Sequence, residues 1–66
     1  MQIKYFQDTD TLMINFNDSQ IQETKEINEN VLVELDHNGN IVSITLEHAK
    51  SYANINDLNF QQVLST

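Results

Sequence analysis

The sequence contains no cysteine, no proline and no arginine, and it has a single glycine. The absence of cysteine excludes disulfides and thiolate metal sites. One glycine is too few for the glycine-rich loops that cradle phosphate groups. Only three lysines face ten acidic residues, so the formal net charge is −7. Because this charge repels phosphate backbones and anionic membranes, we expect no direct nucleic-acid binding and no membrane partner. We also expect no cofactor, since no cofactor-binding motif is present.

The length of 66 residues allows one domain, spanning residues 1–66. A chain this short buries only about 60% of the surface that its unfolded form exposes. Since disulfides are excluded, oligomerisation or a partner chain is the expected source of extra stability. No apolar run approaches the roughly 20 residues of a membrane helix, and the alternating segment Ile3–Gln7 does not resemble a signal peptide. We therefore expect a soluble, cytoplasmic protein.

The segment from Val31 to Leu46 predicts a β-hairpin. Apolar and polar residues alternate on both sides of Asn38-Gly39, and this dipeptide favours a two-residue type I′ turn with positive φ at both positions. The resulting register pairs His37 with Asn40, Leu35 with Val42, Val33 with Ile44, and Val31 with Leu46. Turn chemistry and alternation agree on this register, which places all six apolar side chains on one face.

Three further segments complete the predicted fold. Residues 3–5 and 12–16 form an N-terminal hairpin around a turn at residues 7–10, and residues 21–27 form a weaker strand. Residues 48–56 form either a helical turn or an irregular loop. Asn56 or Asp57 can N-cap a short helix over residues 57–64, which would cover one face of the sheet. The predicted fold class is α+β, with a four- or five-stranded antiparallel meander sheet and a short C-terminal helix.

The face opposite the predicted core is less polar than a solvated face should be. Alternation along the strands places four apolar residues on this face, namely Phe6, Met13, Leu32 and Ile41. They are either scattered surface residues, which are normal, or a shared patch for self-association or a partner.

Acidic residues cluster in the middle of the sequence, at Glu23, Glu26, Glu29 and Glu34. They form either a solvated face or an acidic rim that meets a basic partner. The candidate partner-binding residues are accordingly Phe6, Met13, Leu32, Ile41, Glu23, Glu26 and Glu34.

The remaining polar residues predict no catalytic site and no metal site. Asp8 and Asp10 lack the further ligands of a calcium loop and are expected to cap a turn. Glu47 and His48 are adjacent, so on a strand they would point to opposite faces. His37 lies at the predicted turn and is expected to be exposed. No nucleophile motif or zinc spacing is present, and we expect the protein not to be an enzyme.

The sequence resembles a family of small bacterial proteins of unknown function over about residues 1–50. The matching elements are Lys4-Tyr5, Asp8, Asp10, Leu12, Ile14, Phe16, Glu23-Thr24, Glu26, Val31–Asp36, Gly39–Ile44 and Leu46–Ala49. Some members are encoded beside small RelE-like toxins, so the resemblance implies an antitoxin role for those members. It implies no catalytic residues. Residues 51–66 lie outside the resemblance.

Three functional hypotheses follow, of which the third, an enzyme or metal protein, has no specific sequence motif behind it. The first is a protein-interaction module that neutralises a basic partner in the manner of an antitoxin, which the charge and the resemblance favour. The second is a self-associating homodimer with a structural or regulatory role. A neighbouring gene for a small basic ribonuclease would distinguish the first from the second.

Overall fold

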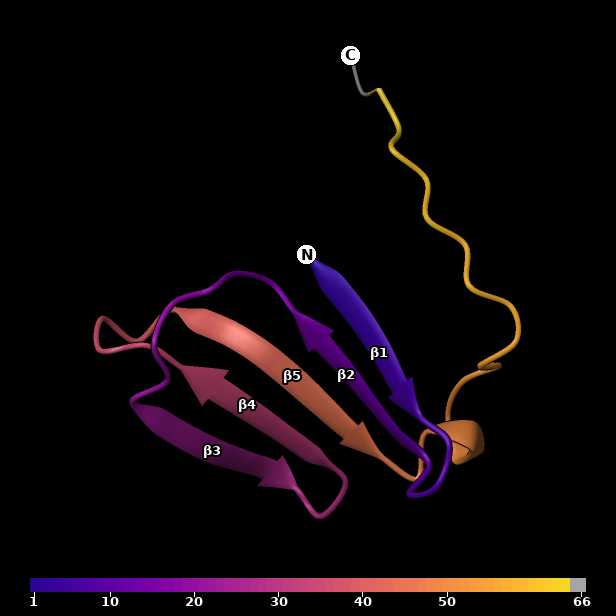
Figure 1. Ribbon diagram of the computed structural model, residues 1–66, viewed down its shortest axis with the longest axis horizontal. Coiled ribbons are helices and arrows are strands. Elements are labelled where there is room, and N and C mark those ends of the chain that lie inside the picture. The colour runs from indigo at the N-terminus through magenta and orange to yellow at the C-terminus, as the bar shows by residue number, and fades with distance from the viewer. Residues whose placement is uncertain (65–66) are drawn as a thin grey trace.

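The computed structural model describes residues 1–64 and consists of one five-stranded antiparallel sheet (Figure 1). Its strands are β1 (Gln2–Phe6), β2 (Thr11–Asn15), β3 (Glu23–Asn28), β4 (Val31–Leu35) and β5 (Ile41–Glu47). A single 3₁₀ turn, η1 (Ala49–Ser51), follows β5. The five-stranded antiparallel sheet is therefore confirmed, whereas the α part of the predicted α+β class is not.

The strand order is β1-β2-β5-β4-β3, so the predicted meander is wrong. The chain leaves β2, passes the end of the β4–β5 hairpin and enters β3 at the far edge (Figure 1). Backbone bonds hold this crossing segment: the amide of Phe16 donates to the carbonyl of Val42, and the amide of Gln22 to that of Leu35, both at 2.8 Å. These bonds use only backbone atoms, which explains why no side-chain pattern indicated the crossing.

The β4–β5 hairpin has the predicted register from Val31, which pairs with Leu46, up to Glu34, and departs from it only next to the turn. Val33 pairs with Ile44 as expected, but Leu35 pairs with Ile41 and not with Val42, because a bulge shifts the register. The turn is also wider than predicted. Only Gly39 in it has a positive φ, of 82°, which fits a type I turn followed by a left-handed residue and not a type I′ turn.

The Asp36 side chain favours the wider turn. Its Oδ1 accepts the amides of Asn38 and Asn40, each at 2.9 Å, and the amide of Gly39 donates to the Asp36 carbonyl at 3.0 Å. The Asp36 carboxylate thus accepts hydrogen bonds from two amides of the turn, at Asn38 and Asn40, and so favours the wider turn over a two-residue loop.

The N-terminal hairpin is confirmed, with Ile3 opposite Ile14 and Tyr5 opposite Leu12. Asp10 closes its turn with a φ of 55°. Aspartate tolerates this left-handed conformation better than most residues, so Asp10 can occupy a turn position of the kind that usually favours glycine.

The predicted C-terminal helix over Asp57–Leu64 is not formed, and these residues have no regular structure. An isolated helix of eight residues is marginal in water, and helices in proteins depend on packing an apolar face. On a helix, Leu58 would lie on a different side from Phe60 and Leu64, so the segment would have no single apolar face to bury. Residues 48–56 were predicted to form either a helical turn or an irregular loop. They contain both, namely the 3₁₀ turn η1 and an irregular loop after it.

Candidate interaction faces of the sheet

One face of the sheet is almost entirely apolar, and we call it the aliphatic face. Cross-strand partners in an antiparallel sheet point to the same side, so the register defines this face directly. One row runs Ile3, Ile14, Ile44, Val33 and ends at Lys25; the next runs Tyr5, Leu12, Leu46, Val31 and ends at Asn28. Apolar side chains thus extend over four strands, and polar ones appear only at the β3 edge.

The aliphatic face has no second layer over its centre. Figure 1 shows no segment crossing over the middle of β4 or β5. Val33 and Ile44 remain partly exposed. Among residues 1–64, the only fully buried hydrophobic side chains are Val42 and Ala49, exposed by 1% and 0%. Val42 lies near the start of β5 and Ala49 lies beyond its end, in η1, so the middle of the sheet lacks the core that a two-layer domain would have.

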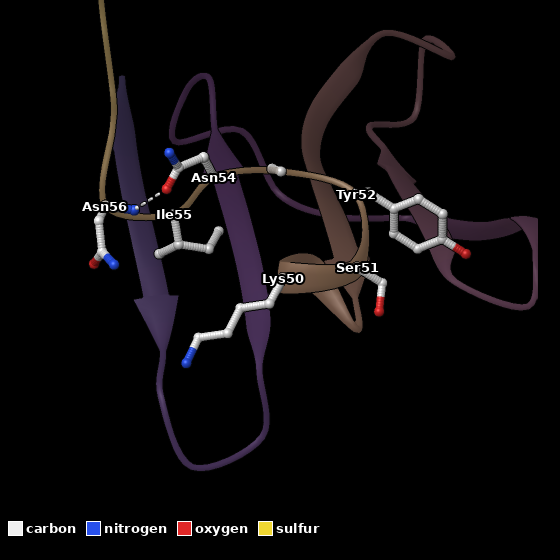
Figure 2. A pocket seen from close by; sticks show the side chains of 7 residues that line it. Lys50, Ser51, Tyr52, Asn54, Ile55 and Asn56 are labelled. Atoms are coloured by element: carbon white, nitrogen blue, oxygen red, sulfur yellow. Dashed lines mark hydrogen bonds between the residues drawn. The ribbon is translucent and has the colours of Figure 1, made fainter.

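The segment after η1 forms a groove with the β1–β2 side of the aliphatic face. This groove of 390 Å³ lies between Ile3, Leu12 and Ile14 on the sheet and Ile55 and Leu58 on the segment. Ile55 points toward β1 and β2 (Figure 2). A second, open hollow of 590 Å³ is lined by residues 50–56 alone, so it follows a bend of the backbone and involves no strand.

The other face, which we call the mixed face, combines apolar and acidic side chains. Its central row runs Lys4, Met13, Thr45, Leu32 and Glu26. Glu34 and Glu47 lie on the same face in the flanking rows, and Phe6 lies at its β1 edge, 46% exposed. Five of the seven predicted partner-binding residues therefore share one face: Phe6, Met13, Leu32, Glu26 and Glu34.

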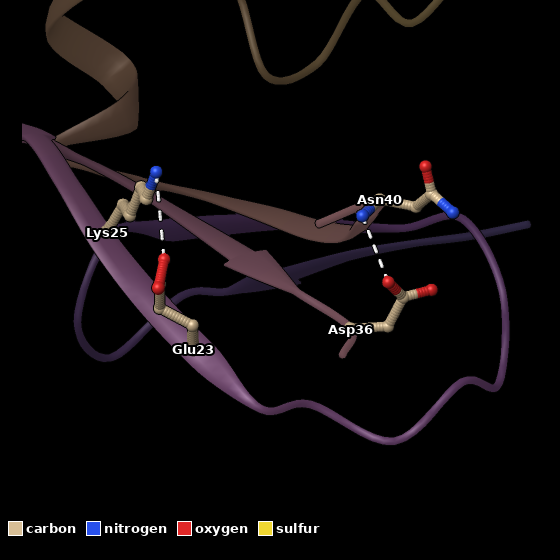
Figure 3. A network of polar contacts seen from close by, with 4 residues as sticks. All are labelled: Glu23, Lys25, Asp36 and Asn40. Atoms are coloured by element: carbon tan, nitrogen blue, oxygen red, sulfur yellow. Dashed lines mark hydrogen bonds and ion pairs between the residues drawn. The ribbon is translucent and has the colours of Figure 1, made fainter. Parts of the chain in front are cut away.

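The other two predicted residues lie elsewhere. Ile41 sits at the start of β5 opposite Leu35, at the bulge, where strict alternation is lost. Glu23 is also opposite Leu35, and therefore lies on the aliphatic side of β3. There it forms a 3.6 Å ion pair with Lys25, and Figure 3 shows this pair beside the Asp36 turn. Glu29 lies in the β3–β4 turn.

The charges differ between the two faces. On the strands, the mixed face carries the carboxylates of Glu26, Glu34 and Glu47 against the single cation of Lys4. The aliphatic face carries Glu23 and Lys25, which neutralise each other. The strands of the mixed face thus carry a net negative charge, whereas those of the aliphatic face carry none.

A buried hydroxyl fixes one carboxylate of the mixed face. Ser43 is 1% exposed, and its hydroxyl donates to Oε1 of Glu34 at 2.6 Å. Hydrogen bonds to ionised acceptors are short and strong. This bond therefore orients the Glu34 carboxylate on the neighbouring strand.

The corner between the first turn and η1 is fixed by Asp10. Its Oδ1 accepts the Tyr5 phenol at 2.6 Å and the amide of Lys50 at 3.1 Å, while its carbonyl accepts the amide of Ala49. The hydrogen bond to Asp10 is the main reason that the pKa of Tyr5 is raised to about 12. Sequence reasoning assigned Asp10 to a turn but missed these longer-range contacts, for which spacing gives no signal.

The histidines belong to no convergent site. His48 has a left-handed φ of 57°, and its Nδ1 lies 2.9 Å from Oδ1 of Asn30. The Asn30 amide donates to the Tyr52 hydroxyl at 2.7 Å. His37 is exposed in the turn. Within residues 1–64 no group of three or more histidine and acidic side chains is placed to hold a metal ion.

No helix among the described residues has the length and apolar character needed to cross a membrane.

Together these features define a single-layer β-domain with two chemically distinct faces. The chain belongs to a family of proteins of unknown function, DUF2283, whose model matches residues 2–50. The match covers all five strands and ends within η1, so the segment from residue 51 onward lies outside it. Neither the curated proteins nor the solved structures include a significant match to this chain.

Proposed function

We propose that this domain is a protein-interaction module whose mixed face binds a basic protein, in the manner of an antitoxin that neutralises its toxin. The observation that carries the proposal is the placement of Glu26, Glu34 and Glu47 around Met13 and Leu32 on one face. Protein interfaces typically combine an apolar centre with a polar rim. A rim of carboxylates selects partners that present lysine and arginine, and it accelerates their encounter.

The chemistry supports binding without catalysis as part of the same proposal. His48 is held by an amide side chain and faces no nucleophile or carboxylate partner in the contacts of the described residues. A basic partner also fits the charge of −7, which disfavours nucleic acid and anionic membranes as alternatives. The resemblance to proteins encoded beside RelE-like toxins supports a small basic ribonuclease as the specific partner.

Affinity purification from the native host tests this proposal when two charge reversals on one strand are compared. Glu26→Lys changes the mixed face, whereas Glu23→Lys makes the same change on the aliphatic side of β3. The wild-type protein and Glu23→Lys should capture the same basic protein, in a salt-sensitive manner. Glu26→Lys should lose it.

A second measurement tests the antitoxin form of the proposal. If the captured protein is a ribonuclease, an equimolar amount of this chain should block its cleavage of RNA, and Glu26→Lys should not. Equal capture by all three proteins, or a captured partner that is acidic, would show that the mixed face is not the binding site.

A further inference from the structure

We infer that the aliphatic face is a second and separate interface, which packs against the aliphatic face of another copy of this chain. This inference does not rest on the proposed function, because it concerns the opposite side of the sheet. It also moves self-association away from the patch of Phe6, Met13, Leu32 and Ile41, to which the sequence assigned it.

The surface area of the chain is larger than that expected for a compact monomer, as it would be if a partner were missing. The accessible surface is 5441 Å², whereas a folded monomer of 7.6 kDa is expected to expose about 4300 Å². The excess is about 1100 Å², and a stable interface buries roughly 800 Å² on each partner. The radius of gyration is 13.3 Å, against about 11 Å for a compact chain of this length.

The excess surface has two sources. One is the part of the aliphatic face at Ile44 and Val33, over which no segment passes. The other is the segment after the groove, where Leu58, Phe60 and Leu64 are 71%, 74% and 92% exposed. A second sheet about 10 Å away would cover the first source, as in a β-sandwich.

Charge favours a second copy as the occupant of this face. Two chains that each carry −7 repel one another, so they can associate only where carboxylates are few or neutralised. The aliphatic face meets this condition, since its strand charges are the paired Glu23 and Lys25 at the β3 edge. The mixed face, with three carboxylates against Lys4, does not.

The geometry is also compatible with a two-fold contact, the commonest symmetry of oligomers. β5 is the middle strand, and Ile44 is the middle residue of its row, flanked by Ile14 and Val33. A two-fold axis near Ile44 would stack the two rows on each other. It would leave the β3 edges, and the segments after η1, at the rim.

The test uses a matched pair of substitutions at adjacent positions in β4. Val33→Asp places a charge on the aliphatic face, and Leu32→Asp places the same charge on the mixed face. Light scattering should give twice the chain mass for wild type and Leu32→Asp, and the single mass for Val33→Asp. A monomeric wild type at about 100 μM would overturn the inference. So would dissociation by Leu32→Asp with Val33→Asp still dimeric.

A cysteine-labelling measurement covers the case in which Val33→Asp fails to fold. The chain has no cysteine, so Ile44→Cys and Thr45→Cys each introduce one thiol, on opposite faces of β5. Labelling of Ile44→Cys should slow as the protein concentration rises, because association is concentration-dependent. Labelling of Thr45→Cys should not. A thiol at position 44 that is protected equally at all concentrations would indicate cover by the chain's own C-terminal segment, and would overturn the inference.

Discussion

The Tyr5 phenol and the Asp10 carboxylate are joined by a 2.6 Å hydrogen bond across the first turn. The same carboxylate accepts the amide of Lys50, forty residues further along the chain. This contact fixes the segment after β5 to the N-terminal hairpin, and so determines where residues 53–58 meet the aliphatic face. A polar contact at one corner thus positions part of an apolar groove.

The Tyr5–Asp10 contact predicts an abnormal alkaline titration. The chain has two tyrosines, so Tyr52→Phe leaves Tyr5 as the only titrating phenol. Its absorbance change should have a midpoint of about 12, because the bond to Asp10 raises the pKa of Tyr5. Adding Asp10→Asn should return the midpoint toward the ordinary value near 10. A midpoint near 10 in both proteins would contradict the contact.

The same shift predicts the direction of the stability change with pH. The folded-state pKa of Tyr5 lies above its unfolded value, so the contribution of this group is complete below about pH 10. It is lost as the pH rises toward about 12. The urea midpoint should therefore fall between these pH values in the wild type, and fall less in Tyr5→Phe.

We predict that Gly39 is required because of its backbone φ angle, and not because a side chain at this position would clash with neighbouring atoms. Its φ is +82°, and a Cβ built there would meet nothing within 4 Å. Gly39→Ala should therefore cost about 1–2 kcal/mol of unfolding free energy, which is the penalty for a left-handed residue. Gly39→Val should cost more because it is β-branched, and Gly39→Asn less. Urea unfolding measures all three, and an unchanged Gly39→Ala would mean that the turn is different.

The comparison of sequence and structure shows which features alternation can predict. Period two correctly placed Phe6, Met13 and Leu32 on one face, because the β-strand backbone imposes that period on every side chain. It failed at Ile41, where a bulge adds a residue to β5. Glu23 was misplaced because it was grouped with Glu26 by closeness in sequence, whereas alternation puts residues three apart on opposite sides of β3.

The strand order and the absence of the helix have a different origin. The crossing from β2 to β3 is held by backbone amides of Phe16 and Gln22, which every non-proline residue possesses. The capping residues Asn56 and Asp57 suggested a helix, but a cap does not supply the packing that short helices need. Local signals therefore predicted the strands, whereas non-local pairing decided the topology.

The bond between Ser43 and Glu34 is predicted to stabilise the pairing of β4 and β5 on the mixed face. Ser43 is 1% exposed, and its bond to the Glu34 carboxylate is 2.6 Å long. Ser43→Ala should lower the unfolding free energy by about 1.5–3 kcal/mol, as for hydrogen bonds to charged groups. Glu34→Gln should cost less, since an amide oxygen still accepts. Strictly additive losses in the double variant would mean that the two side chains do not interact.

The last prediction concerns strain at His48. Its φ of 57° is left-handed, which costs a non-glycine residue about 1–2 kcal/mol. Its Nδ1 contact with Asn30 offsets part of that cost. His48→Ala keeps the strain and loses the contact, so it should destabilise by about 1 kcal/mol. His48→Gly loses the contact but relieves the strain, so the unfolding free energy should stay near the wild-type value. His37→Ala, at an exposed turn position, serves as the control and should change stability by less than about 0.5 kcal/mol. If His48→Gly is instead as unstable as His48→Ala, position 48 stores no strain and the contact with Asn30 alone accounts for the loss.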